Sequence, residues 1–109
     1  MAKPDKPEDE RSPLAEIDRL IHEPARLMIM ANLYVVESAD YTYLISRTGL
    51  TWGNISSHVA KLEAASYIEV EKKFVDKKPH TMLHLTATGR AAFEEYRQRL
   101  QQFMDGLPQ

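Results

Sequence analysis

The chain has 109 residues, of which 43% are hydrophobic and 28% are charged, and its formal net charge at pH 7 is −2. These values are typical of a soluble globular protein with one domain and one modest core. No apolar run is long enough to cross a bilayer. Cysteine is absent, which excludes disulfides and thiolate metal sites. The first residues lack the apolar segment of a secretory signal, so we expect a cytoplasmic protein.

Residues 1–12 contain two prolines, seven charged side chains and almost no apolar residue. This composition predicts a disordered N-terminal tail, and the folded domain is expected over residues 13–105. A short first helix is expected from Ser12 or Pro13, because Ser12 can cap it and Glu16 completes a capping box. The apolar stripe of this helix would consist of Leu14, Ile17, Leu20 and Ile21.

A helix-turn-helix is predicted in the middle of the chain. Pro24 opens a helix over residues 24–36 that is apolar on most sides and is therefore expected at the centre of the fold. After a turn that ends at Asp40, a plausible cap, a third helix is expected over residues 41–47. Gly49 supplies the positive φ that ends this helix, and Thr51 caps the next one. Helix, short glycine turn and helix together form the motif.

The helix that Thr51 caps extends to Glu63 and has one apolar and one polar face. Ile55, Val59 and Leu62 recur at i, i+4 and i+7, which is one stripe of a helix. On a helical projection, Asn54, Ser57 and Lys61 face outward. Placed in a DNA major groove, such donors, acceptors and a cation are suited to contacts with base edges and phosphates.

The hydrophobic period changes after this helix. Residues 67–74 alternate between apolar and charged side chains, which predicts a strand. A charged connection follows, and residues 81–85 form a second strand. Pro79 is expected in the connection or on an edge, since it would not fit a central strand. The resulting β-hairpin has a basic tip formed by Lys72, Lys73, Lys77 and Lys78.

A last helix is predicted over residues 86–104, with Thr86 as its cap. Its large apolar side chains follow 3-4-3 spacing, which forms a seam for another helix or part of an ordinary core. These side chains are Phe93, Tyr96, Leu100 and Phe103. The order of elements predicts a mainly α, α+β fold: a winged helix-turn-helix with a two-stranded β-wing and a long C-terminal dimerisation helix.

Four segments resemble the MarR/ArsR-like winged-helix transcriptional regulators, particularly their small single-domain members. His22-Glu-Pro-Ala-Arg-Leu-Met-Ile resembles the opening of the family's central helix, and residues 49–63 resemble its recognition-helix signature. Tyr67-Ile-Glu-Val-Glu-Lys resembles the first wing strand, and Leu85-Thr-x-x-Gly-Arg resembles the end of the wing. Two positions depart from the family pattern: Ser66 replaces a glycine, and Ser57 replaces an arginine.

The resemblance implies a homodimer that binds double-stranded DNA, with half-sites roughly one helical turn apart, ~34 Å. Repression by occupation of a promoter is the implied action. The recognition-helix residues at or near DNA would be Thr51, Trp52, Asn54, Ser56, Ser57, His58 and Lys61. Those of the wing would be Lys72, Lys73, Lys77, Lys78 and His80. The first and last helices would form the dimer interface with Leu14, Ile17, Ile21, Phe93, Tyr96, Leu100 and Phe103.

Other interpretations remain open at this stage. His58 projects onto the flank of the buried stripe, which favours packing over base reading, and Trp52 suits either packing or stacking on a DNA sugar. The net charge and Ser57 allow a second hypothesis, a winged-helix protein–protein module that does not bind DNA.

Enzymatic chemistry has little support. No metal-binding pair of histidines, nucleophile elbow, phosphate loop or dinucleotide motif is present, so we expect no enzymatic activity, metal or cofactor. A cleft for an unidentified small-molecule effector is a further hypothesis. Its candidate lining residues are Leu20, Met28, Tyr41, Tyr96 and Phe103.

Overall fold

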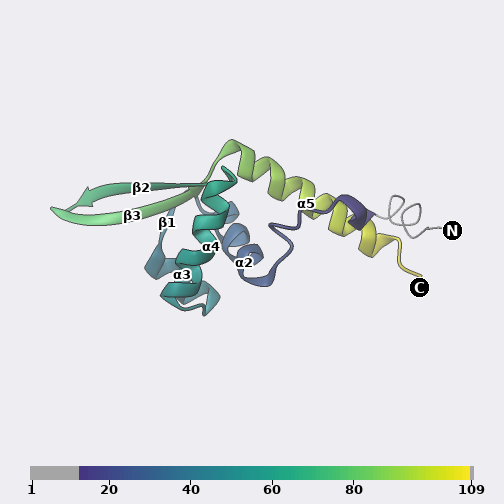
Figure 1. Ribbon diagram of the computed structural model, residues 1–109, viewed down its shortest axis with the longest axis horizontal. Coiled ribbons are helices and arrows are strands. Elements are labelled where there is room, and N and C mark those ends of the chain that lie inside the picture. The colour runs from purple at the N-terminus through teal and green to yellow at the C-terminus, as the bar shows by residue number, and fades with distance from the viewer. Residues whose placement is uncertain (1–12, 109) are drawn as a thin grey trace.

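The computed structural model describes residues 13–108, an elongated body from which a two-stranded wing and a long helix extend in opposite directions (Figure 1). In chain order the elements are η1 (Pro13–Glu16), α2 (Pro24–Val35), β1 (Ala39–Asp40), α3 (Tyr41–Thr48), α4 (Trp52–Ala64), β2 (Ile68–Val75), β3 (Lys78–Leu85) and α5 (Ala87–Asp105). None of the helices in this part of the chain is long and apolar enough to span a membrane.

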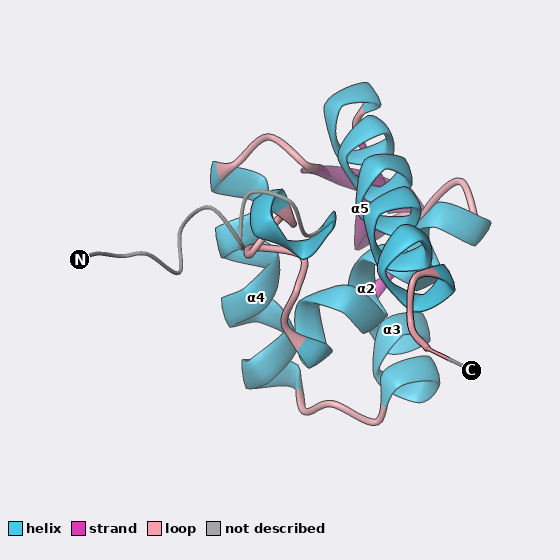
Figure 2. Ribbon diagram, turned by 90° about the vertical axis from the view of Figure 1, so that its right-hand side faces the viewer, coloured by secondary structure: helices cyan, strands magenta, loops and turns pink. Residues whose placement is uncertain are grey.

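Helix α2 is the centre of the core, as its composition predicts. It begins where the Glu23 side chain accepts a hydrogen bond from the Arg26 backbone N–H at 2.8 Å. Ile29 and Leu33 are fully buried, and α2 packs against α3, α4, α5 and β3 (Figure 2). The expectation that it is apolar on most sides overstates its burial at the C-terminal end, where Val35 is 83% exposed.

The expected first helix is wrong in length. Only the single 3-10 turn η1 forms, and the chain then runs without helix to α2. The reason is Asp18, whose Oδ1 accepts hydrogen bonds from the backbone N–H groups of Leu20 at 2.9 Å and Ile21 at 3.1 Å. Such a local side-chain turn competes with helical hydrogen bonding. Ser12 and the tail over residues 1–12 lie outside the described residues.

The sheet has three antiparallel strands in the order β1-β3-β2. Strand β3 begins at Lys78, earlier than the sequence indicates, because the connection is only the two-residue turn Asp76-Lys77. Strand β1 is too short to produce a sequence pattern, and it pairs β3 only near Leu83. Pro79 therefore lies on a stretch of β3 that has one neighbour, β2, as expected for a proline in a sheet.

Helix α5 begins at the cap Thr86, whose Oγ1 accepts a hydrogen bond from the Gly89 N–H at 2.9 Å. A Cβ at Gly89 would lie 2.1 Å from the Tyr67 carbonyl oxygen, so only glycine permits this close approach of α5 to the start of the wing. Phe93 and Tyr96 then enter the core, while the far end of α5 extends beyond it beside η1 (Figure 1). The predicted mainly helical winged-helix fold is confirmed, with β1 as an additional strand.

Candidate nucleic-acid interface

Helix α4 is fixed to the body by one face. Gly49, at φ 75°, ends α3, and Thr51 Oγ1 accepts a hydrogen bond from the Asn54 N–H at 3.1 Å. The predicted stripe of Ile55, Val59 and Leu62 is buried. Of the predicted DNA contacts on this helix, five are exposed: Thr51, Trp52, Asn54, Ser57 and Lys61. The other two, Ser56 and His58, are half-buried.

His58 packs between α4 and α2. Its Nδ1 accepts a hydrogen bond from the Arg26 guanidinium at 3.1 Å and lies 4.0 Å from the Glu23 carboxylate. The side chain is 20% exposed. The hydrogen bond from the Arg26 backbone N–H holds the pKa of Glu23 below its usual value, against an opposing effect of burial. This geometry agrees with a packing role for His58, and it adds Arg26, which the sequence did not single out.

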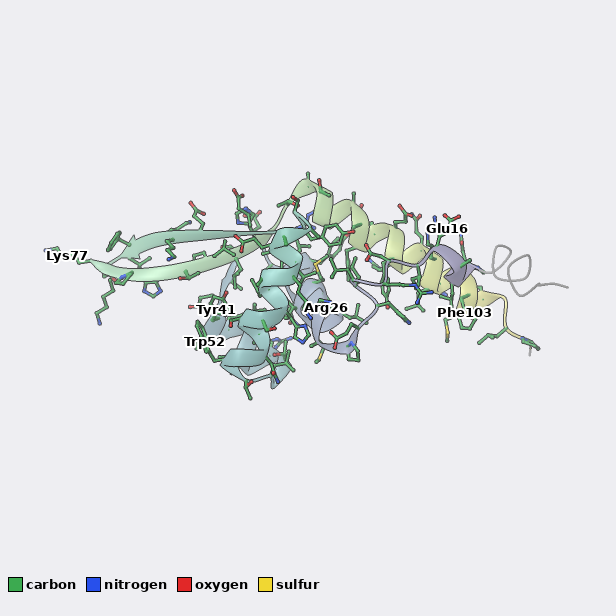
Figure 3. All side chains as sticks on the ribbon, in the orientation of Figure 1. Glu16, Arg26, Tyr41, Trp52, Lys77 and Phe103 are labelled. Atoms are coloured by element: carbon green, nitrogen blue, oxygen red, sulfur yellow. The ribbon has the colours of Figure 1, made fainter. Side chains whose placement is uncertain are left out.

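Trp52 stands at the first position of α4, and of the two alternatives that the sequence left open the structure shows packing, while stacking on a DNA sugar stays a prediction. Its ring lies 4.4 Å from the Tyr41 ring, centroid to centroid, at an angle of 56°, so it packs on the helix before it. It nevertheless remains 58% exposed. Figure 3 shows the two rings together beneath the wing. Burial, followed by the charge of Glu63, raises the pKa of Tyr41 above its usual value.

The wing leaves the body as a free arm. Residues 71–79 are all exposed, including the four predicted lysines, whereas His80 is half-buried. Glu71 is paired with Lys73 at 3.8 Å. Lys77 lies at the extreme end of the wing, far from the end of α5 that holds Phe103 (Figure 3). The wing thus presents four lysines and two carboxylates, and one lysine, Lys73, is paired with one carboxylate, Glu71.

The turn at the tip of the wing is strained. Asp76 and Lys77 have φ of 52° and 66°, the pair of positive values that a two-residue hairpin turn requires. Glycine or asparagine is usual at such positions, and a lysine in the left-handed region costs roughly 1–2 kcal/mol. Residues held in such conformations cluster at functional sites. Of the two residues with positive φ, Lys77 is a cation at the extreme end of the wing (Figure 3).

The predicted dimer residues divide into two groups. Ile17, Ile21, Phe93 and Tyr96 are buried in the core of the single chain, which leaves them little surface for a second subunit. Tyr96 also lies 2.9 Å from His22 Nδ1, and burial raises its pKa. Leu14, Leu100 and Phe103 are partly buried at the far end of α5.

The same end of α5 has exposed apolar residues that the sequence pattern did not single out. Met104 and Leu107 are 54% and 46% exposed. Leu107 is four residues beyond Phe103, so its signal was the next step of the 3-4-3 spacing, whereas Met104 lies one residue off that seam.

One crevice in the described part of the structure bears on the hypothesised effector cleft. A crevice of about 240 Å³ lies between the segment after η1 and α5, and of the five candidates only Tyr96 lines it. Its other walls are polar, with Asp18, Glu95 and Arg99 among them. The described residues contain no cluster of histidine and carboxylate side chains that could hold a metal ion.

A helix-turn-helix followed by a β-wing and a long helix defines a winged-helix protein. The family model described as winged helix DNA-binding domain matches residues 25–104, and the chain belongs to this family. It is 32% identical over 78 residues to the uncharacterized protein MJ0432 of Methanocaldococcus jannaschii, covering 72% of this chain and 85% of that protein.

Solved structures agree with this assignment. A transcriptional regulator homologue from Pyrococcus horikoshii OT3 has a TM-score of 0.79 and 26% identity, covering 96% of this chain and 98% of that one. A MarR-family transcriptional regulator from Silicibacter pomeroyi has a TM-score of 0.60 and 16% identity, covering 94% of this chain and 71% of that one. The resemblance to MarR-like regulators is therefore confirmed at the level of fold.

Proposed function

We propose that this protein is a homodimeric transcriptional regulator that binds specific double-stranded DNA and represses by occupying promoters. Helix α4 enters the major groove with Asn54, Ser57 and Lys61 toward the bases and phosphates. The wing reaches the neighbouring backbone with its four lysines. The observation that carries this proposal is the tip of the wing, where Lys77 occupies a left-handed position in an arm exposed throughout residues 71–79.

Electrostatics supports the proposal despite the net charge of −2. The exposed arm contains four lysines, and of its two carboxylates Glu71 is paired with Lys73. Without an arginine at Ser57, α4 lacks the side chain best suited to bidentate contact with guanine. We therefore infer that α4 positions the protein with modest base readout, and that affinity depends on the wing and on a second subunit.

The test is a mobility-shift titration with a duplex that the wild-type protein enriches from a random library. Lys78→Glu should weaken binding and lower the log–log salt slope by about 0.9 for each phosphate that the variant no longer neutralises. Arg19→Glu makes the same charge change at an exposed site after η1 and serves as the matched control. Equal binding by the two variants would refute contact through the wing. Absence of duplex binding by the wild-type protein at low salt would refute the function and favour the protein–protein module.

Dimerisation is proposed through the far end of α5. Met104 and Leu107 are exposed there, next to the partly buried Leu100 and Phe103, and η1 is the element beside them (Figure 1). A second copy of the same helix end would cover this surface in a two-fold arrangement. Light scattering should show a dimer for the wild type and a monomer for Met104→Lys with Leu107→Lys. The double variant Ala87→Lys with Thr88→Lys, at the exposed start of α5, should remain dimeric.

A further inference from the structure

Phe74 is an aromatic side chain at a place where the fold does not need one. It is 79% exposed, two residues before the turn of the wing. The period of two along β2 places it on the same face as the buried Ile68 and the half-buried Val70. The core ends before Phe74, so the ring continues the apolar face of the sheet into a region without a core beneath it.

The surroundings of Phe74 indicate a polyanion as the occupant of this surface. Lys72 and Lys73 precede it on β2, and Lys77 and Lys78 follow it across the turn. Its cross-strand neighbour is Pro79, which is also exposed and apolar. Lys72 shares the face of Phe74, whereas Lys73 and Lys78 lie on the opposite face of the wing. The tip thus combines an exposed apolar side chain with four lysines and one carboxylate, that of Asp76. This combination is complementary to DNA, whose phosphates line both edges of a groove and whose stacked base pairs offer apolar faces to a side chain that unstacks a step.

The dimensions fit the minor groove. The exposed part of β2, from Glu71 to Val75, reaches about 16 Å beyond the core at ~3.3 Å per residue. Under the proposed function, in which α4 enters the major groove and the wing reaches the neighbouring backbone, the end of this arm lies next to the groove that this backbone borders. Two strands roughly 4.8 Å apart with their side chains are too wide for a minor groove of about 6 Å. A single aromatic ring from the tip is narrow enough to enter this groove.

We propose that Phe74 is a wedge that enters the minor groove and partly unstacks one base step, while the wing lysines hold the flanking phosphates. This inference rests on the proposed DNA-binding function. It assigns to Phe74 a part of the protein's preference for particular DNA sequences. Apolar wedges of this kind kink the duplex, and pyrimidine–purine steps deform most easily. The bound sites should therefore have TA or CA/TG steps where the wing lies.

The test uses the duplex enriched by the wild-type protein, with 2-aminopurine at the step beside the wing. Wild-type binding should raise the fluorescence of this base, because unstacking relieves its quenching. Phe74→Ala should abolish the rise and weaken binding by about tenfold, within the range for loss of one aromatic–base stack. Its log–log salt slope should stay unchanged, because phenylalanine neutralises no phosphate.

Two further variants separate the wedge from a structural role of the ring. Val75→Ala truncates the neighbouring exposed apolar side chain on the other face of β2 and should behave as the wild type. Phe74→Leu retains an apolar wedge and should restore most of the fluorescence rise. If Phe74→Ala matches the wild type in fluorescence and affinity, the wedge is refuted while the DNA-binding function stands.

The failure of the underlying function has a different signature. If the wild-type protein binds no duplex at low salt, the proposed function and the wedge fall together. If it instead binds vesicles of phosphatidylserine and phosphatidylcholine, and Phe74→Ala does not, the wing tip is a membrane contact and the wedge is overturned.

Discussion

The Arg26 guanidinium donates a hydrogen bond to Nδ1 of His58 at 3.1 Å and so joins α2 to α4. Because arginine is always a donor, Nδ1 must be the unprotonated ring nitrogen, and the proton of the imidazole lies on Nε2. Arg26 is itself oriented by its Nε, which donates to the Leu20 carbonyl oxygen at 2.6 Å. The angle of α4 on the body thus depends on an acceptor at position 58.

Removal of that acceptor should affect both stability and binding. We expect His58→Ala to lower the free energy of unfolding by about 1–2 kcal/mol, because a half-buried guanidinium loses a charge-assisted hydrogen bond. DNA affinity should fall as well, because the hydrogen bond between Arg26 and His58 holds α4 on the body. Urea unfolding and mobility shift measure the two effects. His58→Gln keeps an acceptor oxygen and should recover much of the stability and of the DNA affinity. If His58→Gln and His58→Ala lose equal amounts, the hydrogen bond from Arg26 does not account for the effect.

The hydroxyl of Tyr67 donates a short hydrogen bond to the Asp18 carboxylate and ties the start of the wing to the segment after η1. Burial, together with this hydrogen bond and the charge of Asp18, raises the pKa of Tyr67 from 10.0 to about 12. Because the pKa of Tyr67 is higher in the folded state than in the unfolded chain, the protonated hydroxyl stabilises the fold, and this contribution is complete at pH values below the pKa of the unfolded chain. That contribution is lost as the pH rises from about 10 toward 12.

Tyr67→Phe should therefore be less stable than the wild type at neutral pH, with a difference that shrinks above about pH 10. The ring is retained, so the packing of the aromatic group is matched between the two proteins. The midpoint of urea unfolding, followed across this pH range, measures the difference. If the stability difference between the wild type and Tyr67→Phe is the same at all pH values, the pKa of the Tyr67 hydroxyl is not raised in the folded state.

Local signals explain why so much of the fold could be predicted. Asp40, Thr51 and Thr86 each cap the helix that follows them, and Gly49 has the left-handed backbone that its turn requires. Each signal lies within three or four residues of the structure that it determines. The recognition helix and the wing strands follow from these caps and from two hydrophobic periods.

The features that were missed depend on contacts distant in sequence or on chemistry that no period reveals. The pair of Tyr67 and Asp18 joins residues 49 positions apart. The same Asp18 ends the first helix through its side chain. Strand β1 consists of two residues and depends entirely on β3. Phe74 reads as an ordinary inward position of a strand, and only the structure shows that the core ends before it.

Gly89 and Gly53 form a matched pair for testing the junction of the wing with α5. A methyl group at Gly89 would meet the Tyr67 backbone at 2.1 Å, whereas one at Gly53 would have no neighbour within 4 Å. Gly89→Ala should destabilise the fold by about 1–3 kcal/mol or more, because backbone on both sides must move. Gly53→Ala should stabilise helix α4 by up to about 1 kcal/mol. Thermal unfolding of both variants measures these two opposite changes in stability. Equal changes in the two variants would exclude the close contact at Gly89.

The chain has a left-handed serine, Ser66 at φ 65°, where relatives of the resembled family have glycine, and a left-handed lysine, Lys77 at φ 66°. The left-handed backbone of each residue costs roughly 1–2 kcal/mol, and glycine would relieve this strain. Glycine also gives the unfolded chain more conformational entropy, which offsets part of the gain. Ser66→Gly and Lys77→Gly should therefore each raise the stability by up to about 1 kcal/mol.

The two variants should differ in DNA binding. Ser66 lies at the end of α4 and bears no charge, so Ser66→Gly should bind as the wild type does. Lys77→Gly removes the outermost cation of the wing, so it should bind more weakly and with a salt slope smaller by about 0.9 for the phosphate that Lys77 neutralises. A more stable protein that binds less well would indicate that the strain at Lys77 is retained for its charge. If Lys77→Gly binds as tightly as Ser66→Gly, Lys77 contacts no phosphate in the complex.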